Sequence, residues 1–228
     1  MAVLTGSGIS ADSGVPTFRD AQTGLWEKYD PLQLATPGAF LENPELVWSW
    51  YKWRRQLIKN ASPNPGHFTL VDFESNFDNF TLITQNVDGL HQRAGSKNII
   101  ELHGNINRSR CWRDGHRFDV WPENGPEPPL CPICGQFLRL DVVWFGEELP
   151  VEELETAFVA ARNCDIFFSI GTSGLVYPAA SLIPEASRWG AAIVEINLEL
   201  TPISTLADFL LLGKSCQILP NLYKEAFY

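Results

Sequence analysis

The chain has 228 residues, of which 45% are hydrophobic, and carries a formal net charge of −10. Its length allows one large domain or a domain with a smaller one inserted, and its acidity argues against a general electrostatic grip on nucleic acid or on an anionic membrane surface. Because the sequence has neither a secretory signal at its start nor an apolar stretch of about 18 residues, we expect a cytoplasmic protein that does not cross a membrane.

The first predicted element is an apolar strand, residues 1–4, that leads into a glycine-rich turn. Gly6 and Gly8 would let the backbone approach an anion closely, and Ala11 is small enough for a helix to pack against the strand. This spacing fits a relaxed dinucleotide fingerprint, although an ordinary tight turn is an equal alternative. About 20 residues further on, Asp30-Pro31 and a helical pattern stand where a dehydrogenase has a second strand with an acidic ribose ligand. The turn alone therefore predicts a phosphate site without naming the function.

Apolar runs that end in glycine or small polar residues recur along the chain. Their sequences are AVLTGSG, FTLITQNVDG, DIFFSIGTSG and AAIVEINLE. Such runs, separated by helical stretches, are typical of a parallel α/β sheet, which binds ligands at its strand ends. Two stretches break the alternation: residues 31–66 are tryptophan-rich with a helical pattern, and residues 108–139 are rich in Cys, Pro and Gly. We interpret both as insertions that form a smaller module beside the sheet.

Several motifs in sequence order resemble those of the sirtuins, the family of NAD-dependent protein-lysine deacylases. The motifs are TGSGISADSGVPTFRD, TQNVDGLHQRAG, ELHGN, VVWFGEELP, IGTSGLVYPAA and INLE, and they extend over nearly the whole chain. The resemblance implies an α/β fold with a Rossmann-like NAD-binding domain formed by residues 1–30, 67–107 and 140–228. It implies a small domain formed by the helical insertion 31–66 and the Cys-containing, zinc-ribbon-like insertion 108–139, with NAD and acyl-lysine meeting in the cleft between the domains.

The reaction that the resemblance implies consumes NAD as a co-substrate. The acyl oxygen of a modified lysine in a protein substrate displaces nicotinamide from the ribose, and the products are nicotinamide, free lysine and O-acyl-ADP-ribose. His103, in ELHGN, would be the general base that activates a ribose hydroxyl, because imidazole titrates near neutral pH. A single histidine is more often structural than catalytic, but the position of His103 within the family motif favours the catalytic role.

The resemblance assigns the NAD contacts to the polar ends of the apolar runs and to a segment near the C-terminus. The residues are Gly6, Ser7, Gly8, Ile9, Ala11, Asp12, Thr17, Phe18 and Arg19 in the first turn, Gln85, Asn86 and Asp88 after the second run, Gly171, Thr172 and Ser173 after the third, Asn197, Leu198 and Glu199 after the fourth, and Ser215. Gln85 would contact the ribose, whereas Asn86 and Asp88 would hydrogen-bond the nicotinamide carboxamide. As an isolated pattern, Asn-x-Asp is more often a helix cap.

Substrate recognition is predicted from two further segments. Tyr51 and Arg54 are three residues apart and would share a helix face. With a small residue upstream, at Ala35, this spacing resembles the class III sirtuins, the desuccinylases and demalonylases, so we expect succinyl or malonyl groups to be preferred and acetyl also to be removed. The alternative is an exposed basic helix face. The resemblance also implies β-strand addition of the substrate peptide to extended backbone at Val142, Phe145, Gly146 and Glu147.

The cysteine content raises the question of a metal site. Five cysteines in a chain without a secretory signal favour free thiols or metal ligands over disulfides. Sirtuins commonly carry two Cys-x-x-Cys pairs for zinc, but here the pair of Cys131 and Cys134 is intact, while Cys111 is followed by Asp114 at the fourth position. Asp114, or His116 two residues later, could complete a tetrahedral site with three thiolates. Loss of the metal, with tryptophan and proline packing in its place, is an equal alternative.

Two other functions use the same sequence features. An ADP-ribosyltransferase or NAD hydrolase would replace the acyl oxygen by another nucleophile, and a non-enzymatic NAD-sensing module would not need a base at His103. The intact ELHGN motif and the peptide-pairing segment VVWFGEELP argue against both.

Overall fold

The computed structural model describes residues 1–16, 29–119 and 125–228. Its larger part is a six-stranded sheet with the order β3-β2-β1-β7-β8-β9, in which all neighbouring strands are parallel. The strands are β1 (Ala2–Thr5), β2 (Thr81–Thr84), β3 (Ile99–Glu101), β7 (Ile166–Ile170), β8 (Ala192–Asn197) and β9 (Phe209–Leu212). The predicted parallel α/β sheet is confirmed, and the four apolar runs form β1, β2, β7 and β8.

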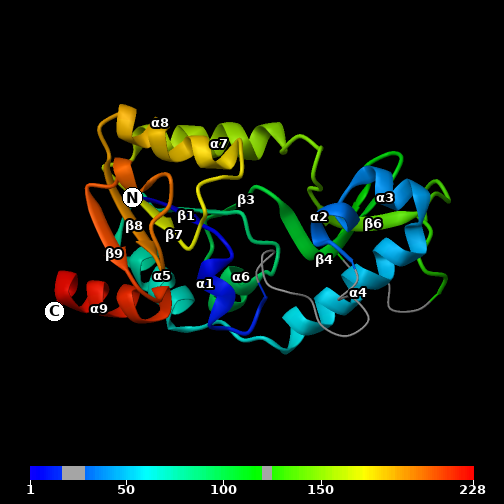
Figure 1. The fold of residues 1–228 in the computed structure, drawn as a ribbon, viewed down its shortest axis with the longest axis horizontal. Helices are drawn as coiled ribbons and strands as arrows, with labels where there is room; N and C mark the ends of the chain where they lie inside the picture. Colours follow the sequence, from blue (N-terminus) through cyan, green and yellow to red (C-terminus); the bar gives the residue numbers. More distant parts are fainter. Residues whose placement is uncertain (17–28, 120–124) are drawn as a thin grey trace.

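Helices cover both faces of this sheet (Figure 1). On one face, α7 (Val151–Asn163) and α8 (Leu182–Arg188) bury a core that includes Leu4 of β1. On the other face, α5 (Pro65–Asn76) and α9 (Ser215–Phe227) bury a second core that includes Val3. The side chains of successive strand residues point to opposite faces, so β1 contributes to both cores.

A smaller antiparallel sheet with the order β5-β4-β6 lies beside the large one (Figure 1). Its strands are β4 (Gly104–Cys111), β5 (Arg117–Phe118) and β6 (Leu138–Val142). Three helices accompany it: α2 (Pro31–Leu34), α3 (Pro37–Glu42) and α4 (Pro44–Asn60). The side chains of Thr36 and Asn43 cap α3 and α4 by accepting hydrogen bonds from backbone N–H groups, and a proline follows each cap.

The small sheet and its helices share a third core. It is rich in aromatic side chains and includes Phe40, Trp48, Trp50, Leu140 and Trp144. Both predicted insertions contribute residues to this core. The strands of the small sheet extend beyond the predicted segment 108–139, however, because β4 begins at Gly104 and β6 ends at Val142. The exact division into domains therefore stays a prediction.

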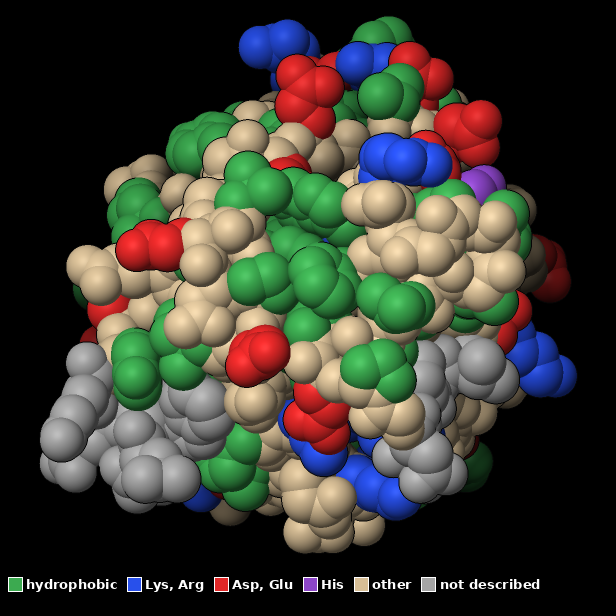
Figure 2. All heavy atoms as spheres, turned by 90° about the vertical axis from the view of Figure 1, so that its right-hand side faces the viewer, with side chains coloured by type: hydrophobic (Ala, Val, Ile, Leu, Met, Phe, Trp, Pro, Cys, Tyr) green, Lys and Arg blue, Asp and Glu red, His purple; other side chains and the backbone are tan. Residues whose placement is uncertain are grey.

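The end of the molecule formed by the small sheet and α3 leaves apolar side chains exposed. They gather near the centre of this face, with charged side chains around them (Figure 2). Among the described apolar residues, Leu41 of α3 is 67% exposed. Within the ranges that the structure describes, no helix combines the length and the hydropathy that crossing a membrane requires.

Candidate functional site

The predicted NAD residues lie at the carboxyl edge of the large sheet. The chain leads from β1 outward through β2 and β3, and later continues on the other side of β1 with β7. Because the chain changes direction here, the carboxyl ends of the neighbouring strands β1 and β7 form the topological switch point, where parallel α/β sheets bind ligands. The segments 6–12, 85–88 and 171–173 follow β1, β2 and β7 there.

The glycine turn after β1 lies directly against the turn after β7. The Gly8 N–H donates to the Gly171 oxygen at 2.9 Å. A Cβ added to Gly6 would lie 2.7 Å from the Gly171 oxygen, and one added to Gly8 would lie 2.7 Å from the Gly171 Cα. The close contact between the two turns therefore requires glycine at both positions, whether or not an anion also approaches the backbone there. The helix that follows, α1 (Gly8–Ala11), is a single turn in which Ile9 is buried.

The predicted residues Thr17, Phe18 and Arg19 lie outside the described part of the chain. The other end of the first turn is described. Asp12, directly after α1, forms an ion pair with Lys214 at 2.7 Å, and Cys216 donates a hydrogen bond to its second oxygen. These contacts join the first turn to the start of α9, where the predicted residue Ser215 is 5% exposed.

Asn86 and Asp88 follow β2 and are both buried. The Asn86 side-chain amide donates to the Gly6 oxygen at 3.1 Å. The Asp88 carboxylate accepts hydrogen bonds from the Leu90 N–H at 2.8 Å and from the Ser10 hydroxyl at 2.7 Å. Burial raises the pKa of Asp88 above its ordinary value, although these two hydrogen bonds act in the opposite direction. The polar groups predicted to face nicotinamide are therefore held together by the fold.

Ser10 and His67 belong to this polar group but were not predicted from the sequence. The Ser10 hydroxyl lies 3.3 Å from His67 Nε2 and accepts a hydrogen bond from Asn86. Burial lowers the pKa of His67 to about 4, so its ring is neutral at physiological pH. His91 lies beside His67 with ring centroids 4.9 Å apart, and its pKa is lowered as well, by burial and by the neighbouring imidazole. The only sequence feature that could have indicated this role was the position of Ser10 within the motif of the first turn.

His103 lies between the large sheet and the small one, after β3 and directly before β4. Its Nδ1 is 3.0 Å from the Gln85 carbonyl oxygen, which can only accept a hydrogen bond. The proton of a neutral ring is therefore on Nδ1, and Nε2 is left as the acceptor. Burial lowers the pKa of His103, against the smaller opposing effect of the Gln85 carbonyl. A neutral ring with a fixed orientation is what a general base requires.

The remaining predicted NAD residues follow β7 and β8. The Thr172 hydroxyl accepts a hydrogen bond from the Gln85 side chain at 3.0 Å, and the Asn197 side chain donates to the Thr172 carbonyl at 2.8 Å. Ser173 lies beside Thr172 and accepts a weak hydrogen bond from Leu175. Leu198 and Glu199 are exposed. The structure thus brings the ends of β2, β7 and β8 together.

The predicted substrate residues Ala35, Tyr51 and Phe145 lie in one region. Tyr51 and Arg54 lie on α4, and they are 3% and 7% exposed. The alternative of an exposed basic helix face is therefore wrong. The Tyr51 ring stacks on Trp144 with centroids 6.3 Å apart, and the Phe145 N–H donates to the Ala35 oxygen at 2.9 Å. Burial raises the pKa of Tyr51 and lowers that of Arg54.

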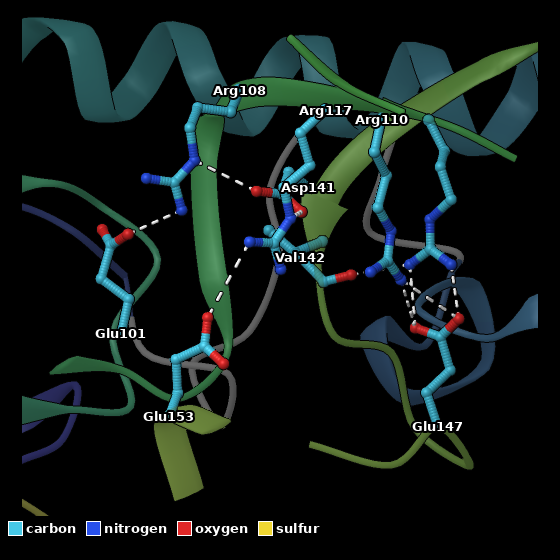
Figure 3. Close-up of polar contacts among 9 residues, drawn as sticks. Glu101, Arg108, Arg110, Arg117, Asp141, Val142, Glu147 and Glu153 are labelled. Atoms are coloured by element: carbon cyan, nitrogen blue, oxygen red, sulfur yellow. Dashed lines mark hydrogen bonds and ion pairs between the residues drawn. The ribbon is translucent and has the colours of Figure 1, made fainter. Parts of the chain in front are cut away.

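Glu147 is the polar centre of the turn after β6. Its carboxylate accepts a hydrogen bond from Arg110 (Figure 3). It also accepts hydrogen bonds from Arg139 and from the Trp144 N–H. Burial would raise the pKa of Glu147, but Arg139 and the Trp144 N–H hold it below its ordinary value. Val142, the last residue of β6, accepts a further hydrogen bond from Arg139 through its carbonyl.

Ion pairs also connect the small sheet with the large one (Figure 3). Arg108 of β4 pairs with Glu101 of β3 at 2.6 Å and with Asp141 of β6 at 3.1 Å. Arg117 of β5 approaches Glu153 of α7 to 3.8 Å. A cavity of about 620 Å³ is lined by these residues. The five residues named above pair with one another, and the cavity lining contains none of the predicted NAD residues, so we do not assign the cavity to the cofactor.

A cluster of metal-binding side chains lies at the far end of the small sheet. The ligand atoms of Cys111, His116, Cys131 and Cys134 all lie within 4.8 Å of one another. The predicted ligand Asp114 is not a member of this group. Its carboxylate forms a two-point hydrogen bond with Arg113 and also contacts the Cys134 thiol. Three thiols and one imidazole match the ligand types and the number that zinc prefers.

Comparison with known proteins gives consistent matches over most of the chain. The sequence profile of the Sir2 family matches residues 6–178. A protein of Aquifex aeolicus named NAD-dependent protein deacylase is 53% identical over 224 residues, which cover 98% of this chain and 93% of that protein. A protein of Pyrobaculum aerophilum named NAD-dependent protein deacylase 2 is 50% identical over 223 residues, which cover 98% of this chain and 89% of that protein.

Solved structures agree with this result. A Sir2 homologue in complex with NAD has a TM-score of 0.92 and 43% identity, and the match covers 99% of this chain and 88% of that one. A complex described as Sir2 with a p53 peptide and NAD+ has a TM-score of 0.87 and 32% identity, and the match covers 99% of this chain and 92% of that one. The similarity therefore includes both sheets.

Proposed function

The chain belongs to the Sir2 family, and from that premise we propose that it is an NAD-dependent protein-lysine deacylase that prefers succinyl and malonyl groups over acetyl. The observation that carries the activity is the position of His103. Its imidazole is half-buried and is oriented by the carbonyl of Gln85, whose side chain bonds Thr172 after β7. The Val143 N–H also donates to the His103 carbonyl at 2.9 Å, so the base is joined to the proposed peptide-binding segment.

The proposed cofactor site combines the turns after β1 and β7 with the polar residues after β2 and β8. NAD supplies the ribose, whose bond to nicotinamide is broken and whose hydroxyl receives the acyl group. Asn86 and Asp88 would bind the carboxamide, and Gln85 and Thr172 would orient the ribose. His103 would accept the ribose hydroxyl proton at Nε2, while its other proton stays on Nδ1 and is donated in a hydrogen bond to the Gln85 carbonyl. These side chains would thus bind the nicotinamide group, orient the ribose and transfer one proton.

The proposed acyl preference rests on Tyr51 and Arg54. An acidic acyl group would bring a carboxylate into an environment where both side chains are buried, and such a charge is costly unless it is paired. The Arg54 guanidinium can offer two parallel hydrogen bonds, and the Tyr51 hydroxyl can offer a third from the same helix face. An acetyl group has no carboxylate to accept these hydrogen bonds.

We also propose that zinc is held by Cys111, His116, Cys131 and Cys134 and that its role is structural. The close grouping of these four ligands supports His116 over Asp114 as the residue that replaces the usual cysteine. The engagement of Asp114 with Arg113 supports the same assignment. Packing without a metal is the alternative. Zinc content and the effect of a chelator on the melting temperature distinguish the two.

One assay tests the activity. Purified protein is incubated with NAD and with acetyl-, succinyl- and malonyl-lysine peptides of the same sequence, and the products are identified by mass spectrometry. We expect nicotinamide and O-acyl-ADP-ribose in equal amounts, with faster turnover of the acidic acyl groups. Deacylation without NAD would contradict the proposal. Nicotinamide release without an acyl-peptide would instead favour an ADP-ribosyltransferase or NAD hydrolase, and NAD binding without turnover would favour a sensing module.

A further inference from the structure

Arg139 of β6 is a charged residue inside an aromatic core. It is 2% exposed, and its two terminal nitrogens lie 2.5 and 2.9 Å from the two oxygens of Glu147. A two-point pair between guanidinium and carboxylate has a fixed relative orientation. The position of Glu147 is therefore determined by a residue eight positions earlier in the chain.

This ion pair anchors the segment 142–147, which begins at the last residue of β6 and then continues outside any helix or strand. Arg139 donates to the Val142 carbonyl at 2.6 Å, and Glu147 accepts from the Trp144 N–H at 2.8 Å. The turn also contains Gly146 with a φ of +88°, a value that side chains rarely allow. Two side chains thus hold both ends of the segment that we propose to bind the substrate backbone.

The same arginine reaches toward the proposed acyl site. Its guanidinium carbon lies 3.3 Å from the ring centroid of Trp144. Trp144 is in turn the ring on which Tyr51 stacks, with an angle of 24° between the planes. Phe145, the next residue, is bonded through its N–H to the carbonyl of Ala35. Displacement of the pair would therefore disturb the backbone that binds the peptide and the surface beside the acyl group.

We propose that Arg139 and Glu147 are positioning residues for the acyl-peptide, acting through Trp144 and the backbone of residues 142–147. This inference rests on the proposed deacylase function. In the described part of the chain, the pair itself contacts neither the predicted NAD residues nor His103, although Val143 of the same segment bonds the His103 carbonyl, so its effect should fall on peptide binding more than on NAD binding. A purely structural ion pair would instead change the amount of folded enzyme, which lowers the apparent kcat and leaves KM unchanged.

The test is E147Q, which keeps the shape of the side chain and removes the charge that Arg139 binds. The control is E148Q on the same turn, where the exposed Glu148 has no described contact with Arg139. Wild-type activity on a succinyl-lysine peptide is measured first, because its absence would contradict the proposed function rather than this inference. In E147Q we expect KM for the peptide to rise about 10-fold or more, with KM for NAD within about twofold of wild type. E148Q should match wild type.

A peptide KM in E147Q within about twofold of the wild-type value would overturn the inference. If E147Q does not fold, R139K takes its place, because lysine keeps the positive charge but cannot form two parallel bonds with a carboxylate. The same selective rise in peptide KM is expected. A folded R139K with unchanged peptide KM, or failure of both variants to fold, would assign the pair to stability alone.

Discussion

Replacement of Arg54 by methionine should separate recognition of an acidic acyl group from the rest of the reaction. Arg54 as a whole is 7% exposed, so water competes little for the hydrogen bonds that its guanidinium could give to a succinyl carboxylate. Burial already lowers the pKa of Arg54, which means that its charge is costly to keep in this position. Methionine keeps much of the length and the apolar contact area of the arginine side chain and does not bury a charge, so we expect the variant to fold.

The magnitude follows from the number of bonds lost. A hydrogen bond to a charged group contributes about 1.5–3 kcal/mol, which corresponds to about 10- to 150-fold in kcat/KM. Arg54→Met should lie near the upper end for succinyl-lysine, because two bonds are removed. Tyr51→Phe removes a single hydroxyl, whose raised pKa keeps it a neutral donor, and should lie near the lower end. Turnover of acetyl-lysine should change by less than about threefold in either variant.

The assay measures kcat/KM for succinyl- and acetyl-lysine peptides of one sequence at saturating NAD. Lys52→Met is the matched control, because Lys52 lies on the same helix with a side chain that is 53% exposed and pairs with Glu127. This control removes one positive charge from α4 outside the proposed pocket. A parallel fall of both activities in Arg54→Met would refute the argument, and so would a wild-type enzyme that already favours acetyl-lysine.

Three further predictions concern the base and the metal. His103→Ala should slow turnover by about 10²–10⁴-fold and leave KM for NAD nearly unchanged, and wild-type turnover in the variant would exclude His103 as the base. Because a base acts in its neutral form and burial lowers the pKa of His103, activity should be lost only as the pH falls below about 6.5; a midpoint of kcat/KM above that value would contradict this. Purified protein should contain about one zinc per chain and melt at a lower temperature with chelator; His116→Ala should lower the zinc content whereas Asp114→Ala should not, and the reverse result would restore Asp114 as the ligand.

The large sheet could be predicted because its central strands are continuous apolar runs followed by polar residues. The short outer strands β3 and β9 were not named in advance. β9 is open to solvent on much of its surface, with Phe209 60% exposed, so its apolar sequence does not reflect the burial that identifies a central strand. The edge at which the predicted NAD residues lie could also be predicted, because they follow parallel strands, whose carboxyl ends meet at one edge of the sheet.

The polar contacts within the site could not be predicted. Arg139 is an ordinary basic residue in the sequence, and only the folded turn brings Glu147 and Trp144 to it. Ser10 and His67 are 57 positions apart in the chain and meet only when α5 packs near the first turn. The grouping of His116, rather than Asp114, with the three cysteines likewise depends on side-chain positions that residue spacing does not specify.

The contact between the turns after β1 and β7 limits how this protein can evolve or be engineered. The backbone of Gly171 lies where a Cβ on Gly6 or Gly8 would be placed. A Cβ on Gly171 would in turn lie 2.6 Å from the Ile9 nitrogen. A library that varies any one of them alone would yield strained proteins, because the opposing backbone has no room to retreat. Within the proposed cofactor site, variation is easier at positions such as Leu198 and Glu199, whose exposed side chains can change one at a time.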